Sequence, residues 1–203
     1  MPVATVNGLD LHYETHGDPS HPALLLIMGF TAQLTSWPDG FVDALVDTDH
    51  HVIRFDNRDA GLSTKSTGEP PDLAAVLTAV AEGTPESLRA PYTLSDMALD
   101  AIGILDHLQT EKAHVVGASM GGMIVQHLAI EHQDRVSSAT SIMSTTGDPA
   151  QGMAHPDVIE ALLAPAPAEL DAAIAHAVEV NRLLAGPLWD REQAVVRTRA
   201  NME

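Results

Sequence analysis

Gly117-Ala118-Ser119-Met120-Gly121 is the stretch that decides the fold of this chain. It follows the apolar run Ala113–Val116 and opens a helical pattern that extends to His132. A Gly-x-Ser-x-Gly between a strand and a helix predicts a nucleophile elbow, a strained turn that raises the serine hydroxyl above a sheet. Glycines flank the serine because neighbouring chain segments pass too close to leave room for side chains. The pentapeptide alone is a weak signal, and its setting between strand and helix makes it a strong one.

Short strands and helices alternate around this stretch. Val3–Val6, Asn7-Gly8 and Leu9–His16 predict a β-hairpin, because Asn-Gly favours a two-residue turn and apolar and polar residues alternate after it. Short buried strands separated by helices predict a mostly parallel sheet with helices on both faces. Ligands of such sheets bind at the carboxyl ends of the strands, where Ser119 lies. The other expected strands are 23–28, 51–55, 113–116 and 136–143, and the expected helices are 36–46, 94–108 and 120–132.

Two segments interrupt this alternation. Residues 66–91 are rich in Pro, Gly, Thr and Glu and predict an irregular excursion with one helix near 73–80. Thr93-x-x-Asp96 then resembles a capping box at the start of the next helix. Residues 150–203 are rich in Ala and interrupted by prolines, which predicts helices. We therefore divide the chain into a sheet-containing part, residues 1–149, and a helical part, residues 150–203.

The composition disfavours several classes of protein. Acidic residues number 28 against 10 basic ones, and this formal charge of −18 disfavours a nucleic-acid partner. No apolar run reaches the ~20 residues of a membrane helix, and the first residues do not resemble a secretion signal. Cysteine is absent, which excludes disulfides and thiolate chemistry. We expect a cytoplasmic protein with no nucleic-acid or membrane partner.

The candidate chemistry centres on Ser119. A serine attacking a carbonyl needs a base for its proton and hydrogen-bond donors for the oxyanion that forms. In an elbow one donor is the backbone N–H after the serine, here Met120, and the other comes from the loop after the third strand. That loop is Met28-Gly29-Phe30-Thr31, and Phe30 N–H is the best candidate. Gly29 would allow a tight turn there.

The side chains of Met28 and Phe30 have two interpretations. Either they line a pocket for the acyl group of a substrate, or they pack against Trp37. The expected backbone role of the loop does not depend on which is correct. No His-Glu-x-x-His and no Gly-x-Gly-x-x-Gly after a strand is present, so we expect neither a metal nor a nucleotide cofactor.

Four blocks in a fixed order are far more specific than the elbow alone. They are Leu-Leu-Leu-Ile-Met-Gly-Phe (24–30), Ser-Trp-Pro (36–38), Arg-Phe-Asp-Asn-Arg-Asp-Ala-Gly-Leu-Ser (54–63) and His-Val-Val-Gly-Ala-Ser-Met-Gly-Gly (114–122). Over roughly residues 3 to 148 the chain resembles the α/β-hydrolase superfamily, and within it the aclacinomycin methylesterase-like esterases. The resemblance implies a serine hydrolase that cleaves a small-molecule carboxylic ester through an acyl-enzyme. In the third block we expect Asp56 and Arg58 to pair and brace the loop near the elbow.

The resemblance also implies parts that this sequence does not contain. The family core has eight strands with a helical cap after the sixth, so residues 150–203 resemble an incomplete cap and strands seven and eight are missing. We expect an incomplete copy of a longer enzyme, with the catalytic acid and histidine beyond residue 203. Asp148 is an alternative acid, although a turn aspartate before Pro149 is the preferred interpretation. His155 and His176 are alternative bases, whereas His127 lies about 12 Å along the serine's own helix.

The sequence is also compatible with two other functions, and it predicts that the chain associates with itself. The chain could be a non-catalytic binding protein, or a cofactor-free perhydrolase, haloperoxidase or other hydrolase of this fold. Without strands seven and eight, strand six would lie at an open edge of the sheet. Open strand edges pair with other chains, so we predict self-association through this edge.

Overall fold

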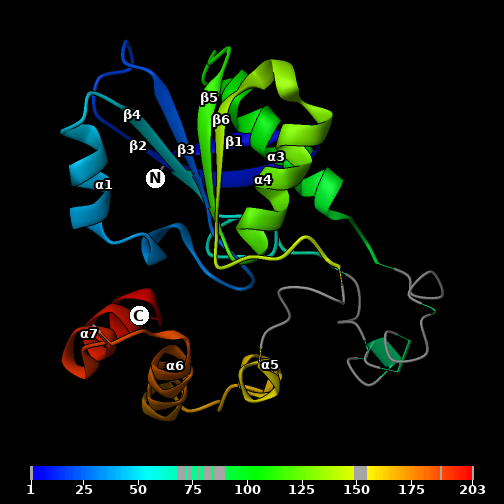
Figure 1. Cartoon of the computed structure of the whole chain (residues 1–203), viewed down its shortest axis with the longest axis vertical. Coiled ribbons are helices and arrows are strands. Elements are labelled where there is room, and N and C mark those ends of the chain that lie inside the picture. Colours follow the sequence, from blue (N-terminus) through cyan, green and yellow to red (C-terminus); the bar gives the residue numbers. More distant parts are fainter. Residues whose placement is uncertain are drawn as a thin grey trace. The chain divides into compact units, whose positions relative to one another are not determined.

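The computed structural model describes residues 2–67, 72, 75, 76, 78, 79, 84, 90–148, 155–187 and 189–202. The chain divides into two compact units, Met1–Ser144 and Thr145–Glu203. The first holds a sheet with its helices and the second holds helices (Figure 1). The helix expected near residues 73–80 lies largely outside the described residues.

The strands of the first unit form one sheet in the order β1-β2-β4-β3-β5-β6. β1 (Val3–Val6) and β2 (Leu9–His16) form the predicted hairpin, and Asn7 and Gly8 in its turn have positive φ angles of 51° and 77°. β2 runs antiparallel to β4 (His51–Phe55). β4, β3 (Ala23–Ile27), β5 (Ala113–Ala118) and β6 (Val136–Ile142) are mutually parallel. The expected mostly parallel sheet, entered through a hairpin, is confirmed.

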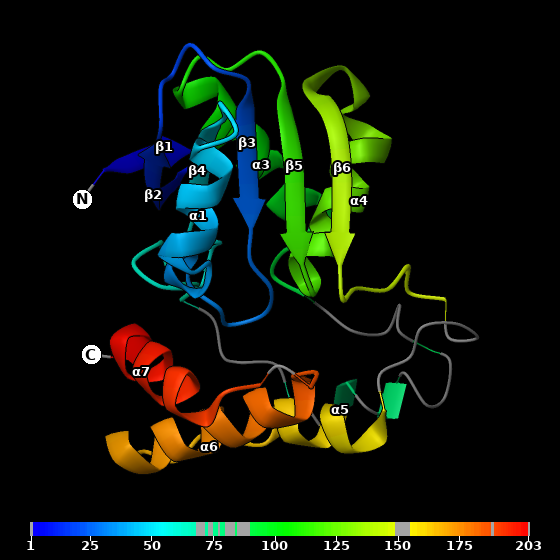
Figure 2. The same ribbon diagram turned by 60° about the vertical axis from the view of Figure 1, so that its left-hand side comes forward.

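Helices cover both faces of this sheet. α1 (Asp39–Val46) lies on one face, and α3 (Leu94–His107) and α4 (Met120–Glu131) lie on the other (Figures 1 and 2). β3 is buried along its whole length because its side chains alternate between two apolar clusters. Leu24 and Leu26 pack with Trp37 and Val42 on the α1 face. The other cluster, on the α3 and α4 face, includes Leu25, Ile27, Met97, Ala101, Ile104, Ile124 and Leu128.

The starts of two helices show how local sequence sets the boundaries. The expected capping box is present: Asp96 N–H donates to Thr93 Oγ1 at 3.2 Å, and Thr93 N–H donates to Asp96 Oδ2 at 2.7 Å. α1, by contrast, begins at Asp39 and not near Ser36. Residues Leu34–Ser36 form a short 3-10 helix, η1, and Trp37 is extended. A residue before proline is disfavoured in the helical region, which delays α1 until after Pro38.

The second unit contains α5 (Pro156–Leu163), α6 (Leu170–Leu184) and α7 (Arg191–Met202). Pro165 and Pro167 separate the first two, and Pro187 lies between the last two, as the sequence predicts. Its small core consists of Ile174, Val178 and Ala194, with Trp189 and Val195 packed against them. None of the helices in the described part of the chain has the length and apolar character needed to cross a membrane.

Candidate active site

Ser119 is the single residue between β5 and α4. Its backbone angles, φ 56° and ψ −123°, lie in a region that residues with a side chain rarely adopt. Ser119 N–H donates to Ile142 O at 2.9 Å, which ties the turn to the end of β6. Ser119 is exposed and directly follows the last residue of β5. β3, β5 and β6 end on the same side of the sheet (Figure 2). The serine therefore lies in a strained turn, open to a ligand at the carboxyl ends of the strands.

The glycines around Ser119 are required by close packing. A Cβ on Gly117 would overlap the carbonyl of Gly121, and a Cβ on Gly121 would overlap the carbonyl of Ile27 at the end of β3. A Cβ on Gly122 would lie 2.5 Å from Ser141 Oγ on β6. Since two of these obstacles are backbone atoms, neither can move aside without shifting a strand or a helix. The first turn of α4 is thus packed directly between the ends of its neighbouring strands.

The loop after β3 lies against the serine. A Cβ on Gly29 would lie 2.8 Å from Ser119 Cβ and 3.2 Å from Ser119 Oγ. Gly29 O accepts from Ala32 N–H at 3.3 Å. The peptide bond between Gly29 and Phe30 is trans, so Phe30 N–H points in the direction opposite to Gly29 O. Within the described residues, neither Phe30 N–H nor Met120 N–H has a hydrogen-bond acceptor. Two unengaged donors therefore flank the residue predicted to be the nucleophile.

The other two predicted functions of this loop concern its side chains. Met28 is half-buried and packs with the cluster that contains Trp37. Phe30 is 63% exposed, and it is Phe41, not Phe30, that stacks on Trp37, with ring centroids 5.5 Å apart. Met28 therefore packs in the core, whereas the ring of Phe30, the residue after Gly29, is exposed to solvent.

The predicted pairing of Asp56 with Arg58 is wrong. Arg58 instead pairs with Asp100 on α3, with Nε–Oδ2 at 2.6 Å and Nη2–Oδ1 at 2.7 Å. Asp56 is buried and accepts from the backbone N–H groups of Leu34 and Leu62 at 2.7 and 2.8 Å. Backbone N–H groups already occupy both carboxylate oxygens of Asp56. The guanidinium of Arg58 therefore pairs with the buried carboxylate of Asp100 on α3.

Arg58 also contacts the segment that leads into α3. Its guanidinium lies over the ring of Tyr92, 4.9 Å from the centroid, and its hydrogen bonds with Asp100 raise the pKa of Arg58. Tyr92 Oη donates to Asp59 at 2.6 Å. Burial, followed by this hydrogen bond, raises the pKa of Tyr92 to about 12. The cluster fastens the loop after β4 to the start of α3.

Several histidines of the first unit have partners other than Ser119. His127 Nδ1 lies 2.6 Å from Glu131 Oε1 and 3.1 Å from Ser95 Oγ, and the bond from His127 lowers the pKa of Glu131. No histidine in the described part of the chain hydrogen-bonds to Ser119. His155, His176 and Asp148 belong to the second unit. Among the described residues no group of His, Asp and Glu side chains could hold a metal ion.

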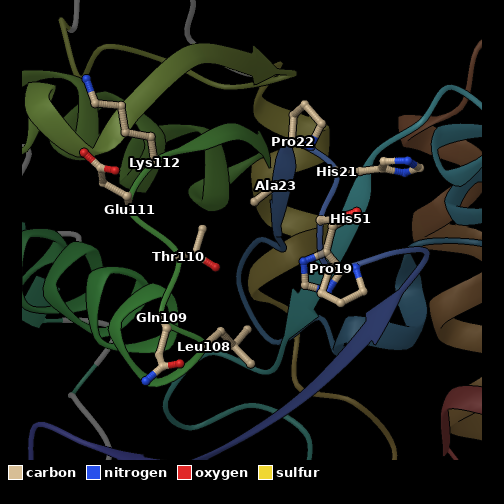
Figure 3. A pocket seen from close by; sticks show the side chains of 11 residues that line it. Pro19, His21, Pro22, Ala23, His51, Leu108, Gln109, Thr110, Glu111 and Lys112 are labelled. Atoms are coloured by element: carbon tan, nitrogen blue, oxygen red, sulfur yellow. The ribbon is translucent and has the colours of Figure 1, made fainter.

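A hollow of about 490 Å³ lies at the opposite edge of the sheet (Figure 3). It is lined where the strands begin, by Pro22 and Ala23 of the β3 start, His51 of β4, and Thr110 and Lys112 before β5 (Figure 3). Burial lowers the pKa of His51 there. Because Ser119 follows the carboxyl end of β5, this hollow has no part in the candidate site.

Comparison with known proteins gives the chain a family. The model of the alpha/beta hydrolase fold matches residues 22–203. Rhodomycin D methylesterase DnrP of Streptomyces peucetius is 36% identical over 141 residues, which cover 70% of this chain and 41% of the relative. 3-Oxoadipate enol-lactonase 2 of Acinetobacter baylyi is 29% identical over 131 residues, 64% of this chain and 40% of the relative.

The solved structures agree with this fold. A meta-cleavage product hydrolase from Pseudomonas fluorescens superposes with a TM-score of 0.71 at 18% identity, covering 100% of this chain and 64% of that one. The chain spans about two fifths of the length of the two curated relatives, 41% and 40%. With a family model that matches nearly the whole chain, and the expected sheet and helices present, this protein belongs to the α/β-hydrolase fold family.

Proposed function

We propose that this chain carries the nucleophile and the oxyanion hole of a serine hydrolase that cleaves a carboxylic ester. Ser119 is the nucleophile, and the N–H groups of Phe30 and Met120 hold the oxyanion. The observation that carries the proposal is the strained turn at Ser119, with the loop of Gly29 packed against its hydroxyl. The N-terminus of α4 adds a favourable dipole for negative charge at the same place.

The reaction proceeds in two steps. Ser119 Oγ bonds to the ester carbonyl carbon while its proton passes to a base, and the carbonyl oxygen becomes the oxyanion. Collapse of this tetrahedral species breaks the bond to the alcohol, which leaves with a proton, and water then releases the acid from the acyl-serine. The N–H groups of Phe30 and Met120 stabilise the negative charge of the oxyanion, which is absent from the ester and from the acyl-enzyme. Preorganised donors therefore lower the barrier without stabilising the reactant equally.

The described histidines of the first unit form no hydrogen bond with Ser119. The alternative bases His155 and His176 stay predictions. Asp148 is the alternative acid. Residues 150–203 as an incomplete cap, and an acid and histidine beyond residue 203, stay predictions. The coding sequence past codon 203 checks both.

Treatment with p-nitrophenyl butyrate is expected to place a butyryl group on Ser119. The activated leaving group makes acylation less dependent on a base, whereas release by water is slow without one, so the adduct accumulates. An oxyanion hole and binding alone sustain about 10³-fold over the uncatalysed reaction. Intact-mass measurement and peptide mapping give the extent and the position of the adduct. Ser144→Ala, a neighbouring hydroxyl, is the matched control and should label like the original chain.

A folded chain that acquires no adduct would contradict the proposal and favour a binding protein. A butyryl group on other serines or lysines, with Ser119 unmodified, would contradict it as well. Formation of a peracid from the butyryl adduct and hydrogen peroxide, faster than hydrolysis, would indicate the perhydrolase alternative.

For the substrate we propose an ester with a small alcohol leaving group. Two of the curated relatives are named a methylesterase and an enol-lactonase, and both names describe cleavage at a carboxylic ester or lactone. The exposed ring of Phe30 offers an apolar contact next to the proposed oxyanion donors.

We also propose that two copies of the chain associate through β6. In the described part of the sheet β6 pairs only with β5, and Ser137–Ile142 are exposed. Ala139→Lys is expected to reduce association, because charged side chains on an edge strand oppose pairing with another chain. Sedimentation velocity should show the original chain above its monomer mass of 21.5 kDa and the variant closer to it. A monodisperse monomer of the original chain would exclude this association.

A further inference from the structure

We infer that Asp56 and Asn57, at the end of β4, are positioning residues that hold both ends of the oxyanion loop, residues 28–34. The inference rests on the proposed function, because it concerns the placement of Phe30 N–H. Asp56 is 2% exposed and Asn57 is 3% exposed, and each acts through its hydrogen bond to the backbone of the loop.

Asn57 holds the first end. Its Nδ2 donates to Met28 O at 2.8 Å, and the residue is 3% exposed. The last β3–β4 pair is Ile27 with Phe55, and beyond it the two strands separate. The side-chain amide of Asn57 links the segments that follow β3 and β4 just after this point. It therefore fixes the peptide that leads into Gly29, the residue packed against Ser119.

Asp56 holds the other end. Its Oδ1 accepts from Leu34 N–H at 2.7 Å, and its Oδ2 accepts from Leu62 N–H at 2.8 Å and lies 3.3 Å from His12 Nδ1. The carboxylate is 2% exposed, so these donors replace the water it has lost. Gly61 makes the arrangement possible, because a Cβ there would overlap the carboxylate.

The segment between the two anchors is a strained turn. Gly29 O accepts from Ala32 N–H, and Thr31 has a φ of 59°. A non-glycine residue keeps such a conformation only where its surroundings enforce it. Anchors at Met28 and Leu34 supply that enforcement. Phe30 N–H lies inside the anchored turn, so its direction is set before a substrate binds, as an oxyanion donor requires.

The test compares Asn57→Leu, which keeps most of the side-chain volume and removes the donor, with the original chain. Two quantities are measured: the rate of butyryl-Ser119 formation against ester concentration, and hydrogen exchange of a peptide covering residues 28–34. We expect the maximal rate to fall by about tenfold or more, with the half-saturating concentration unchanged, because a displaced donor weakens only the transition state. We also expect exchange to rise in 28–34.

The control is Ile104→Val, a core substitution on α3. Ile104 belongs to the apolar cluster on the α3 and α4 face of the sheet, whereas Met28 of the loop packs with the cluster on the α1 face. The substitution lowers stability without changing the loop, and it should leave the rate and the exchange of 28–34 near those of the original chain. Asn57→Ser, whose hydroxyl is too short to reach Met28 O, serves as the second variant if the leucine variant does not fold.

The outcomes separate the two claims. A rate for the Asn57 variants equal to that of Ile104→Val, with unchanged exchange in 28–34, overturns the positioning role. If the original chain forms no adduct at all, the proposed function fails. The anchoring of the loop is then decided by hydrogen exchange alone, including that of Leu34 N–H in Asp56→Asn. Unchanged exchange in both variants overturns it.

Discussion

Replacing Ser119 with glycine is expected to abolish acylation and, at the same time, to raise the free energy of unfolding by about 1 kcal/mol. The hydroxyl is lost, so no ester can form at this position. The backbone at φ 56° and ψ −123° is strained for serine and accessible to glycine, which has no Cβ. Chemical denaturation followed by circular dichroism measures the stability, and the butyryl assay measures the activity.

Ser119→Ala is the matched control for this prediction. Alanine also lacks the nucleophile but keeps the Cβ and hence the strain, so its stability should stay near that of serine while acylation is lost. A glycine variant less stable than the alanine variant would show that the turn is relaxed. Activity in either variant would show that another residue is the nucleophile. The expected pair of results means that stability is given up at this turn for the exposure of the hydroxyl.

Gly121→Ala is expected to destabilise the chain by roughly 3 kcal/mol or more, enough to lower Tm by about 10 °C. The new methyl group would overlap the carbonyl of Ile27 and lie 2.8 Å from Met28 O. Both obstacles are backbone atoms at the end of β3, so α4 would have to move away from the sheet. Thermal unfolding followed by circular dichroism measures the loss.

Gly40→Ala is the control, because it places the same methyl group in a helix with free space. No atom lies within 4 Å of the added Cβ in α1. Alanine favours helix more than glycine does, so this variant should be unchanged or more stable by about 0.5 kcal/mol. Equal effects of the two substitutions would contradict the close packing of α4 on β3.

Local patterns explain why much of the fold could be predicted. The hairpin around Asn7-Gly8, the buried strand Ala23–Ile27 and the Thr93 capping box each depend on residues adjacent in sequence. The sequence places the start of α1 too early because Ser36-Trp37-Pro38 resembles a helix start with proline in the first turn, whereas Trp37 is extended and the helix begins at Asp39. The loop that contains Phe30 could be located because it directly follows a recognisable strand.

Contacts between distant segments could not be predicted in the same way. Asp56 and Arg58 are near neighbours of opposite charge, yet one binds backbone amides of two loops and the other binds Asp100 on α3. Asn57 by itself gave no signal, since its role appears only when the ends of β3 and β4 are brought together. The one local signal for such a role is the pair Asp56-Asn57 directly after a strand, where polar residues lie at the end of the sheet that carries Ser119.

In the proposed active site Ser119 faces the two amide groups of an oxyanion hole. The most direct measurement is a crystal structure of the chain after reaction with an alkyl phosphonate, whose phosphoryl oxygen imitates the oxyanion. We expect phosphorus bonded to Ser119 Oγ, with the phosphoryl oxygen about 3 Å from both Phe30 N and Met120 N. A phosphoryl oxygen directed into solvent, or a phosphonate bonded to a different residue, would contradict it.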